Sequence, residues 1–287
     1  MGLNAFHADA AACLLVNGQL VVAAEEERFR RIKHWAGFPS DTIRYSLDAV
    51  GISLDEVDHI AINQDPHAHL GRKVGFALRR VPTPRLVLDR LRNKRRRAGV
   101  REQLAAAFPG QTFRGTLHAV EHHLAHLSSA FHVSPFEEAV VVSVDGFGDF
   151  ASTAWGVGRG SRLDADERIF FPHSLGIFYQ ALTQYLGFPH YGDEYKVMGL
   201  APYGEPIWLD HMRRICRLES KGRFSLDLRY FRHHRERIAY SWDGGSPEFS
   251  DLFTKELERL LGPRRKPGQP LTQFHRDIAR SAQVMYE

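Results

Sequence analysis

The sequence predicts an α/β fold, and three observations support that prediction. Short apolar runs bounded by turn residues, as at 11–16 and 140–144, are typical of buried strands. Apolar residues at helical spacing, as over 177–186 and 271–287, indicate amphipathic helices. A strand, a glycine-containing turn and a second strand occur twice, near the start and near the middle. Such paired units are typical of a duplicated α/β fold that handles nucleotides.

The first half of the chain is predicted to begin with a hairpin whose two-residue turn is Asn17-Gly18. The first long helix is expected to have Ser40 or Asp41 as its N-cap and to end at Gly51. We expect these elements in order: strands over 11–16 and 19–24, a helix over 40–50, a strand over 59–63, a helix over 101–108 and a strand over 116–120.

The second half is predicted to contain a helix with His122 and His126, and then a strand that ends at Asp145. A glycine-rich turn over 145–149 leads into a returning strand. The segment 191–204 is too irregular for a helix or strand, and ordered loops of this kind often carry function. The other expected elements are a helix over 177–186, a polar irregular stretch over 205–240, a loop over 263–270 and a helix over 271–287.

The composition indicates a soluble globular protein, with 43% hydrophobic and 25% charged residues. No apolar run approaches the roughly 20 residues that cross a bilayer, and no basic segment precedes the first apolar stretch as in a secretory signal. Two cysteines, Cys13 and Cys216, cannot build a disulfide framework. We therefore expect a cytoplasmic protein that does not engage a membrane.

A basic block over 72–101 dominates the charge distribution. It holds twelve Lys or Arg residues and one acid, Asp89, so its net charge is 12 − 1 = +11. Because the whole chain carries +4, the remaining residues sum to 4 − 11 = −7. The block is either a solvated helical insertion or a surface that binds nucleic acid or a phosphorylated substrate. Its one aromatic residue, Phe76, makes base stacking and hence nucleic-acid binding a weak prediction.

His122, His126 and Asp145 are candidate metal ligands. Two histidines four residues apart share one face of a helix, and Asp145 stands where an apolar strand ends, beside which ligands bind in open α/β sheets. Two imidazoles and a carboxylate suit a catalytic transition metal with open positions. Alternatively the pair is incidental, since the chain has sixteen histidines. A metalloprotease is excluded because His123 stands where the general-base Glu is required.

Four further residues have both a structural and a functional interpretation. Gly146 and Gly148 either form a simple hairpin turn or cradle a phosphate group with their backbone N–H groups. Lys33 is either a solvated cation or one placed to meet a phosphate or carbonyl oxygen. His7 is either an exposed loop residue or a general base.

Six segments, in order along the chain, resemble the N-terminal part of the NodU/CmcH-type O-carbamoyltransferases, and IARSAQ near Ala279 also fits. The six are GLNAFHADAAACLLVNGQL, AAEEERFRRIKHWAGFP, HHLAHLSSAF, SVDGFGD, HSLGIFYQALTQYLGF and DEYKVMGLAPYG. The resemblance implies an ASKHA-type fold, like that of Kae1 proteins. It implies a divalent metal, Fe(II), on His122, His126 and Asp145 together with a second Asp further along. It also places His7 and Lys33 near the bound adenylate or acceptor.

The resemblance further implies the reaction. Carbamoyl phosphate and ATP are the co-substrates, and a C-terminal YrdC-like domain makes carbamoyladenylate from them. The carbamoyl group then passes to a hydroxyl of a small-molecule or glycoside acceptor in natural-product or glycan biosynthesis. The alternative is a non-enzymatic or RNA-directed ASKHA protein that uses the basic block over 72–101, and a degenerate gene product is a third possibility.

The resemblance also gives the expected domain organisation. The chain is expected to be the N-terminal portion of the Kae1-like domain, with a first lobe over about 1–170 that contains the basic insertion over 72–101. The start of a second lobe is expected over about 171–287. No YrdC-like segment, later glycine-rich motif or second Asp is found, and the chain stops inside its last amphipathic helix. We therefore expect an incomplete fold that is inactive alone in the full reaction.

Overall fold

The computed structural model describes residues 1–79, 99–236, 238, 240–241 and 247–287. They form two compact units, Met1–His122 and His123–Glu287. The division falls inside helix α6 (His122–Phe131), so His122 belongs to that helix as well as to the first unit. The predicted lobe boundary near 170 stays a prediction. Most of the basic block lies outside the described residues, and helix α3 (Leu70–Arg79) covers its start.

The first unit is built on a five-stranded sheet with the order β3-β2-β1-β4-β5. β1 pairs antiparallel with β2 and parallel with β4, β2 pairs antiparallel with β3, and β4 pairs parallel with β5. The predicted Asn17-Gly18 turn is confirmed, with positive φ at both residues. The strands are β1 (Gly2–Asn4), β2 (Ala11–Val16), β3 (Gln19–Glu25), β4 (His59–Ile62) and β5 (Thr116–Ala119).

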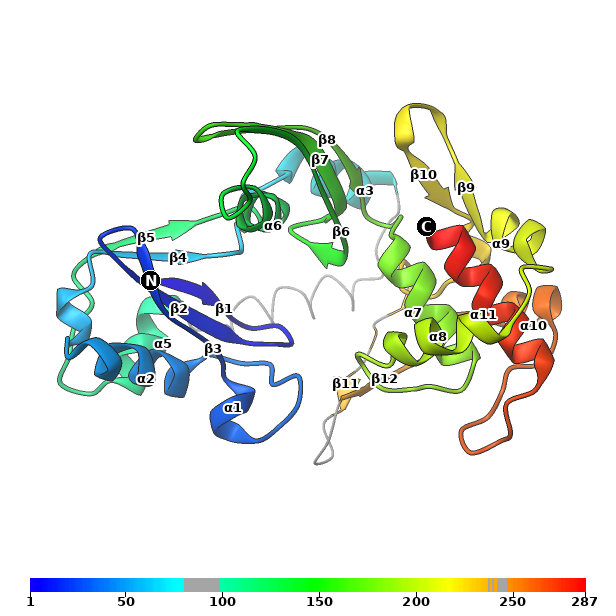
Figure 1. Cartoon of the computed structure of the whole chain (residues 1–287), viewed down its shortest axis with the longest axis horizontal. Helices are drawn as coiled ribbons and strands as arrows, with labels where there is room; N and C mark the ends of the chain where they lie inside the picture. Colours follow the sequence, from blue (N-terminus) through cyan, green and yellow to red (C-terminus); the bar gives the residue numbers. More distant parts are fainter. Residues whose placement is uncertain (80–98, 237, 239, 242–246) are drawn as a thin grey trace. The chain divides into compact units, whose positions relative to one another are not determined.

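Helices α2 (Ser40–Val50) and α5 (Val100–Ala107) cover this sheet (Figure 1). Ile43 of α2 and Leu104 of α5 share one apolar core with Ile60 of β4. These helices therefore bury residues of the sheet in one shared apolar core.

The N-terminus of α2 differs from the prediction. Neither Ser40 nor Asp41 is its N-cap; Pro39 has that position and offers no side-chain oxygen. The fully buried carboxylate of Glu26, just before helix α1 (Glu27–Arg30), instead accepts hydrogen bonds from the backbone N–H groups of Asp41 and Thr42 at 3.2 and 2.9 Å. A residue remote in sequence therefore satisfies the free donors of this helix.

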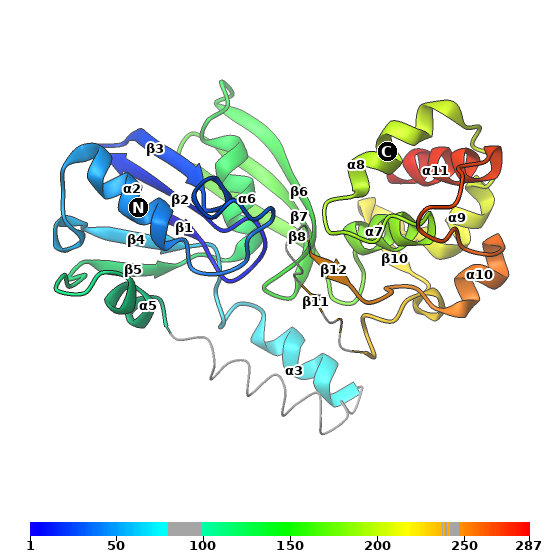
Figure 2. The same cartoon turned by 90° about the horizontal axis from the view of Figure 1, so that it is seen from below.

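The second unit begins with a three-stranded antiparallel sheet in the order β6-β7-β8 (Figure 2). Its strands are β6 (Glu138–Gly148), β7 (Ala151–Arg159) and β8 (Arg162–Phe170). Helix α6 packs on this sheet through Leu127 and Phe131, which contact Val141 and Ala154. Gly158 makes the close approach possible, because a Cβ there would lie 2.6 Å from the Phe131 ring.

Helices dominate the rest of the second unit. α11 packs against α7, α8 and α9, and its Ile278 and Ala282 are fully buried in their shared core. The helices are α7 (Leu175–Tyr185), α8 (Glu194–Leu200), α9 (Leu209–Ile215), α10 (Lys255–Leu261) and α11 (Gln273–Tyr286). Two short hairpins complete it: β9 (Cys216–Leu218) with β10 (Phe224–Leu226), and β11 (Tyr240–Ser241) with β12 (Glu248–Phe249).

The expectation that 191–204 is irregular is wrong. The segment forms α8 and then a 3-10 turn, Ala201–Tyr203. Val197, Leu200 and Ala201 are buried at helical spacing. Their burial stabilises a helix even though the glycine and tyrosine residues of the segment have a low helix propensity. The stretch 205–240, expected to be irregular, likewise contains α9 and the β9–β10 hairpin.

The α/β prediction is confirmed, because helices and two larger sheets alternate along the chain. Within the described ranges, no helix combines the length and apolarity needed to cross a lipid bilayer.

Candidate metal centre

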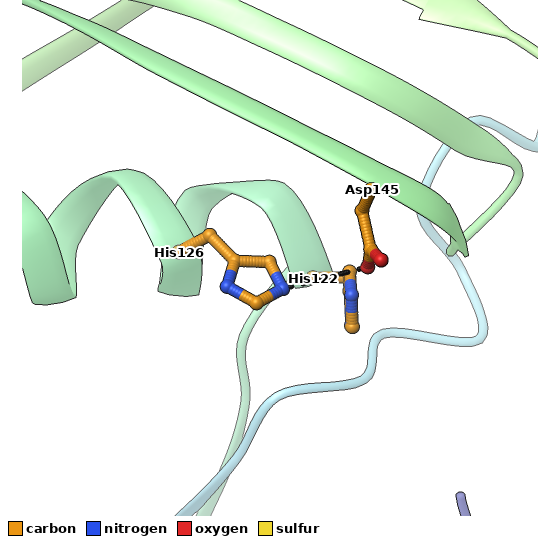
Figure 3. A group of neighbouring side chains, drawn as sticks. All are labelled: His122, His126 and Asp145. Atoms are coloured by element: carbon orange, nitrogen blue, oxygen red, sulfur yellow. Dashed lines mark ion pairs between the residues drawn. The ribbon is translucent and has the colours of Figure 1, made fainter. Parts of the chain in front are cut away.

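Helix α6 and strand β6 bring the three predicted ligands together (Figure 3). The helix begins at His122, and His126 follows one turn later on the same face. One ligand atom from each of His122, His126 and Asp145 lies within 4.8 Å of the other two. His126 Nε2 is 3.6 Å from Asp145 Oδ2. This is the one group of three or more such residues found among the described residues.

The two histidines differ in exposure and in role. His122 is 5% exposed, and its Nδ1 lies 3.3 Å from the main-chain oxygen of Asn63. Donation of Nδ1–H to that carbonyl leaves the Nε2 lone pair for a metal ion. The side chains of His126 and Asp145 are 47% and 39% exposed. A metal held here would therefore be anchored on a buried imidazole and face solvent on its other side.

The start of α7 holds the end of β6 in place. Ser174 Oγ donates to the main-chain oxygen of Asp145 at 3.0 Å and accepts from Ile177 N at 3.1 Å as the N-cap of α7. Gly176 lies so close that a Cβ would be 2.8 Å from the Asp145 oxygen. The position of the Asp145 main chain thus depends on a helix that begins 30 residues further along the chain.

The predicted turn over 145–149 is displaced. β6 continues through Gly148, which pairs with Ala151, and the turn is made by Asp149 and Phe150, both at positive φ. The backbone N–H of Gly146 donates to Asp145 Oδ1 at 2.6 Å. Gly146 and Gly148 are therefore strand residues next to the ligand cluster, and their binding of a phosphate stays a prediction.

His7 lies in the loop between β1 and β2, beside the first ligand. Its ring stacks on that of His122, with centroids 5.7 Å apart and an interplanar angle of 27°. Its Nε2 contacts the Gln64 side-chain nitrogen, which also donates to Ala5 O at 2.8 Å. Because that nitrogen is a donor, His7 Nε2 accepts and its proton resides on Nδ1.

Lys33 lies outside the ligand cluster. It is exposed, in the turn that follows α1. The next residue, His34, pairs through Nδ1 with Asp9 Oδ1 at 2.8 Å, and Phe6 N donates to Gly37 O at 2.8 Å. These contacts join the Lys33 turn to the loop that carries His7.

Sequence reasoning missed three residues of the site. Asn63 and Gln64 directly follow the apolar strand β4. Polar residues at the carboxyl end of a strand could have been predicted as site residues, because ligands bind at that edge of a sheet. Ser174 could have been predicted only as the N-cap of α7. Its position beside β6 results from tertiary packing, which the sequence does not show. His123, between the two ligands, is fully buried and contacts Ser143 Oγ at 2.9 Å, so its role is in the core.

Comparison with known proteins gives consistent results. The model of the carbamoyltransferase N-terminus family matches residues 1–75 and 85–287. An uncharacterized protein of Synechocystis sp. is 38% identical over all of this chain and 46% of its own length. The nodulation protein NolNO of Sinorhizobium fredii is 33% identical over 99% of this chain and 37% of its own length. The chain thus spans less than half of these relatives.

Among solved structures, YeaZ from Pseudomonas aeruginosa aligns with a TM-score of 0.32 and 19% identity, over 58% of this chain and 62% of that one. The match to the family model covers nearly the whole sequence, including every predicted ligand. The chain therefore belongs to the carbamoyltransferase N-terminus family, and its resemblance to the NodU/CmcH-type enzymes is confirmed.

Proposed function

We propose that this chain is the metal- and acceptor-binding part of an O-carbamoyltransferase. The reaction passes a carbamoyl group from carbamoyladenylate, made from ATP and carbamoyl phosphate, to a hydroxyl of a small-molecule or glycoside acceptor. The observation that carries the proposal is the convergence of His122, His126 and Asp145 at the end of β6, in a chain of this family.

The donor set fits a divalent transition metal, and the resemblance points to Fe(II). His122 would bind through Nε2, because its Nδ1 faces the Asn63 carbonyl, and His126 and Asp145 would add an imidazole and a carboxylate. Three protein ligands leave coordination positions open. When bound, the ion would supply Lewis-acid polarisation to an oxygen of the carbamoyl donor.

His7 is proposed as the general base and Lys33 as an electrostatic partner. The acceptor oxygen forms a bond to the carbamoyl carbon, and the bond from that carbon to the adenylate phosphate oxygen breaks. The leaving AMP takes the electron pair, and the acceptor proton passes to His7 Nε2, where it replaces the hydrogen bond from Gln64. The ammonium of Lys33 offsets negative charge on the departing phosphate.

The metal centre is tested by elemental analysis after loading with Fe(II) under anaerobic conditions. His126→Ala removes one of three ligands and is expected to lose the stoichiometric metal of the wild-type chain. His132→Ala is the matched control, because His132 is exposed just beyond the same helix. Full metal content in His126→Ala would show that the ligands are assigned wrongly.

The reaction is tested with radiolabelled carbamoyl phosphate, ATP and a panel of hydroxylated acceptors. Transfer is expected when the remaining part of a carbamoyltransferase of the family, including its YrdC-like domain, is supplied, and absent for the chain alone. His7→Gln should slow transfer by roughly 10²–10⁴-fold, as loss of a general base does. Unchanged transfer by His7→Gln would exclude His7 as the base.

A further inference from the structure

Two asparagines stand side by side where the central parallel strands of the first unit end. Asn4 is the last residue of β1, and Asn63 directly follows β4; in the register of these strands, Leu3 is opposite Ile62. Asn63 Nδ2 donates to Asn4 Oδ1 at 3.1 Å. The pair thus lies at the carboxyl edge of the sheet, where α/β proteins bind ligands.

The orientation of both amides follows from their partners. Asn4 Nδ2 donates to the main-chain oxygens of Asp9 and Ala8, at 2.7 and 3.5 Å. Carbonyl oxygens accept only, so Asn4 must present its Oδ1 to Asn63, and Asn63 must present its Nδ2 in return. One continuous set of hydrogen bonds therefore runs from Asn63 through Asn4 to the loop that carries His7.

The other end of this set reaches the candidate metal centre. The main-chain oxygen of Asn63 lies 3.3 Å from His122 Nδ1, and the His122 ring is nearly fully buried. A neutral imidazole carries its proton on either nitrogen, and only the Nδ1–H form leaves Nε2 as a metal ligand. The position of the Asn63 carbonyl therefore selects the tautomer and the ring orientation that the centre needs.

We propose that Asn4 and Asn63 are positioning residues for the metal centre. Their amide pair fixes the Asn63 carbonyl, and through it the metal-binding form of His122. The pair also connects His122 to the loop of His7 through hydrogen bonds, so that the proposed base and the first ligand keep a fixed position relative to each other. The inference rests on the proposed function, because it concerns the metal centre named there.

Anaerobic Fe(II) titration of the 287-residue chain tests the coupling. Asn4→Ala and Asn63→Ala are each expected to weaken binding about tenfold, as the loss of an outer partner of a ligating histidine does. The double variant should bind no more weakly than either single one, because either change removes the same link. Losses that add in the double variant, or wild-type affinity in both single variants, would overturn the proposal.

Two further variants separate positioning from general damage. Asn4→Asp keeps an oxygen facing Asn63 Nδ2 but loses the donor to the Asp9 and Ala8 carbonyls, so its Fe(II) affinity is expected to lie between those of Asn4→Ala and the wild type. Gln111→Ala removes another amide of the first unit, whose Oε1 accepts from Leu54 N at 2.8 Å, and should leave Fe(II) affinity unchanged. Thermal unfolding of the metal-free forms shows whether each variant is folded.

The tautomer of His122 gives a readout that needs neither metal nor activity. In ¹⁵N NMR of the metal-free chain at a pH where histidine is neutral, wild-type His122 should be protonated at Nδ1. Asn4→Ala and Asn63→Ala should show a mixture of tautomers. If the wild-type chain binds no Fe(II), the proposed metal centre is wrong, but the tautomer measurement still tests whether the asparagines position His122. An unchanged His122 tautomer in both variants would contradict that positioning role.

Discussion

At the scale of single residues, three neighbouring histidines on α6 have separate tasks set by where each side chain lies. His122 and His126 converge on Asp145, whereas His123 is fully buried and contacts Ser143 Oγ. The helical repeat causes this division, because adjacent residues point about 100° apart. Several neighbouring histidines thus predict a metal site only when it is known which of them share one face of the helix.

His233 gives a prediction about pH. It lies among the rings of Phe147 and Phe171, donates Nε2–H to Pro172 O at 2.8 Å, and has His173 and His234 nearby. Burial, with a smaller contribution from His173, lowers the pKa of His233 below its ordinary 6.5. As pH falls below 6.5, the unfolded chain takes up a proton that the folded chain does not, so stability decreases.

His233→Gln keeps a donor for Pro172 O but does not titrate in this range. Its melting temperature should therefore fall less than that of the wild type between pH 7.5 and 5.5. Thermal unfolding followed by circular dichroism measures the difference, with the exposed His132→Gln as control. Parallel acid sensitivity of His233→Gln and the wild type would contradict the assignment.

The sequence points to the three proposed ligands but not to Asn63, which lies beside one of them. His122, His126 and Asp145 have functional side-chain chemistry at a recognisable spacing. Asn63 acts on His122 through a main-chain oxygen, which no side-chain pattern reports. The closeness of His7 and His122 was also unpredictable, because it depends on how β1 pairs with β4, which sets Leu3 opposite Ile62, 59 positions further along the chain.

At the scale of elements, α2 depends on a carboxylate from another segment. Glu26 accepts from Asp41 N, from Thr42 N and Oγ1, and from Arg30 Nε. Glu26→Gln replaces charge-assisted hydrogen bonds with weaker ones and should cost about 1.5–3 kcal/mol of unfolding free energy. Urea unfolding measures it, and the exposed Glu25→Gln is the matched control. Equal stability of the two variants would refute the capping role.

The contact between α7 and β6 gives a second prediction at this scale. In Gly176→Ala, the new Cβ meets the Asp145 main chain at 2.8 Å, so the helix and strand must separate. We expect a loss of about 1–3 kcal/mol, as for overpacked sites, together with weaker Fe(II) binding. Gly199→Ala, at an exposed α8 position with open space, should instead gain about 0.5–1 kcal/mol. Wild-type metal affinity in Gly176→Ala would disprove this coupling.

Elements with strong local signals were predictable, and those formed by packing were not. The Asn17-Gly18 hairpin and the helix before Gly51 follow from turn and stop signals in the sequence. Helix α8 contains Gly199 and two charged residues in its first turns, and it is stable because Val197 and Leu200 are buried against other helices. Only the N-terminus of α2 was not predictable, because Glu26, which accepts from its first backbone N–H groups, lies 14 positions before the helix start.

At the scale of the whole molecule, the two compact units have separate cores. Ile43 belongs to the core of the first unit and Leu182 to that of the second, and both are almost fully buried. Ile43→Ala and Leu182→Ala should each cost about 2–5 kcal/mol. Hydrogen exchange read by mass spectrometry should accelerate mainly in the unit that carries the change. Uniform acceleration across both units would show a single cooperative structure.

The two strand–turn–strand units predicted from the sequence are both present, as β2–β3 and β6–β7, and each is part of a larger meander. β1-β2-β3 and β6-β7-β8 are both three-stranded antiparallel meanders. Asn4 ends the first strand of one, and Asp145 lies near the end of the first strand of the other. The residue proposed as a positioning amide and a residue proposed as a metal ligand thus each lie on the first strand of a meander.

The turn between β6 and β7 has an unfavourable backbone conformation for the residues that form it. Asp149 and Phe150 both adopt positive φ, where a hairpin would ordinarily place Asn-Gly. For a bulky residue this conformation is unfavourable by roughly 1–2 kcal/mol. Phe150 nevertheless packs its ring against that of Phe171, with centroids 5.5 Å apart and planes tilted by 35°. Replacing Asp149-Phe150 with Asn-Gly would therefore relieve the backbone strain of this hairpin, but it would also remove the contact of the Phe150 ring with Phe171.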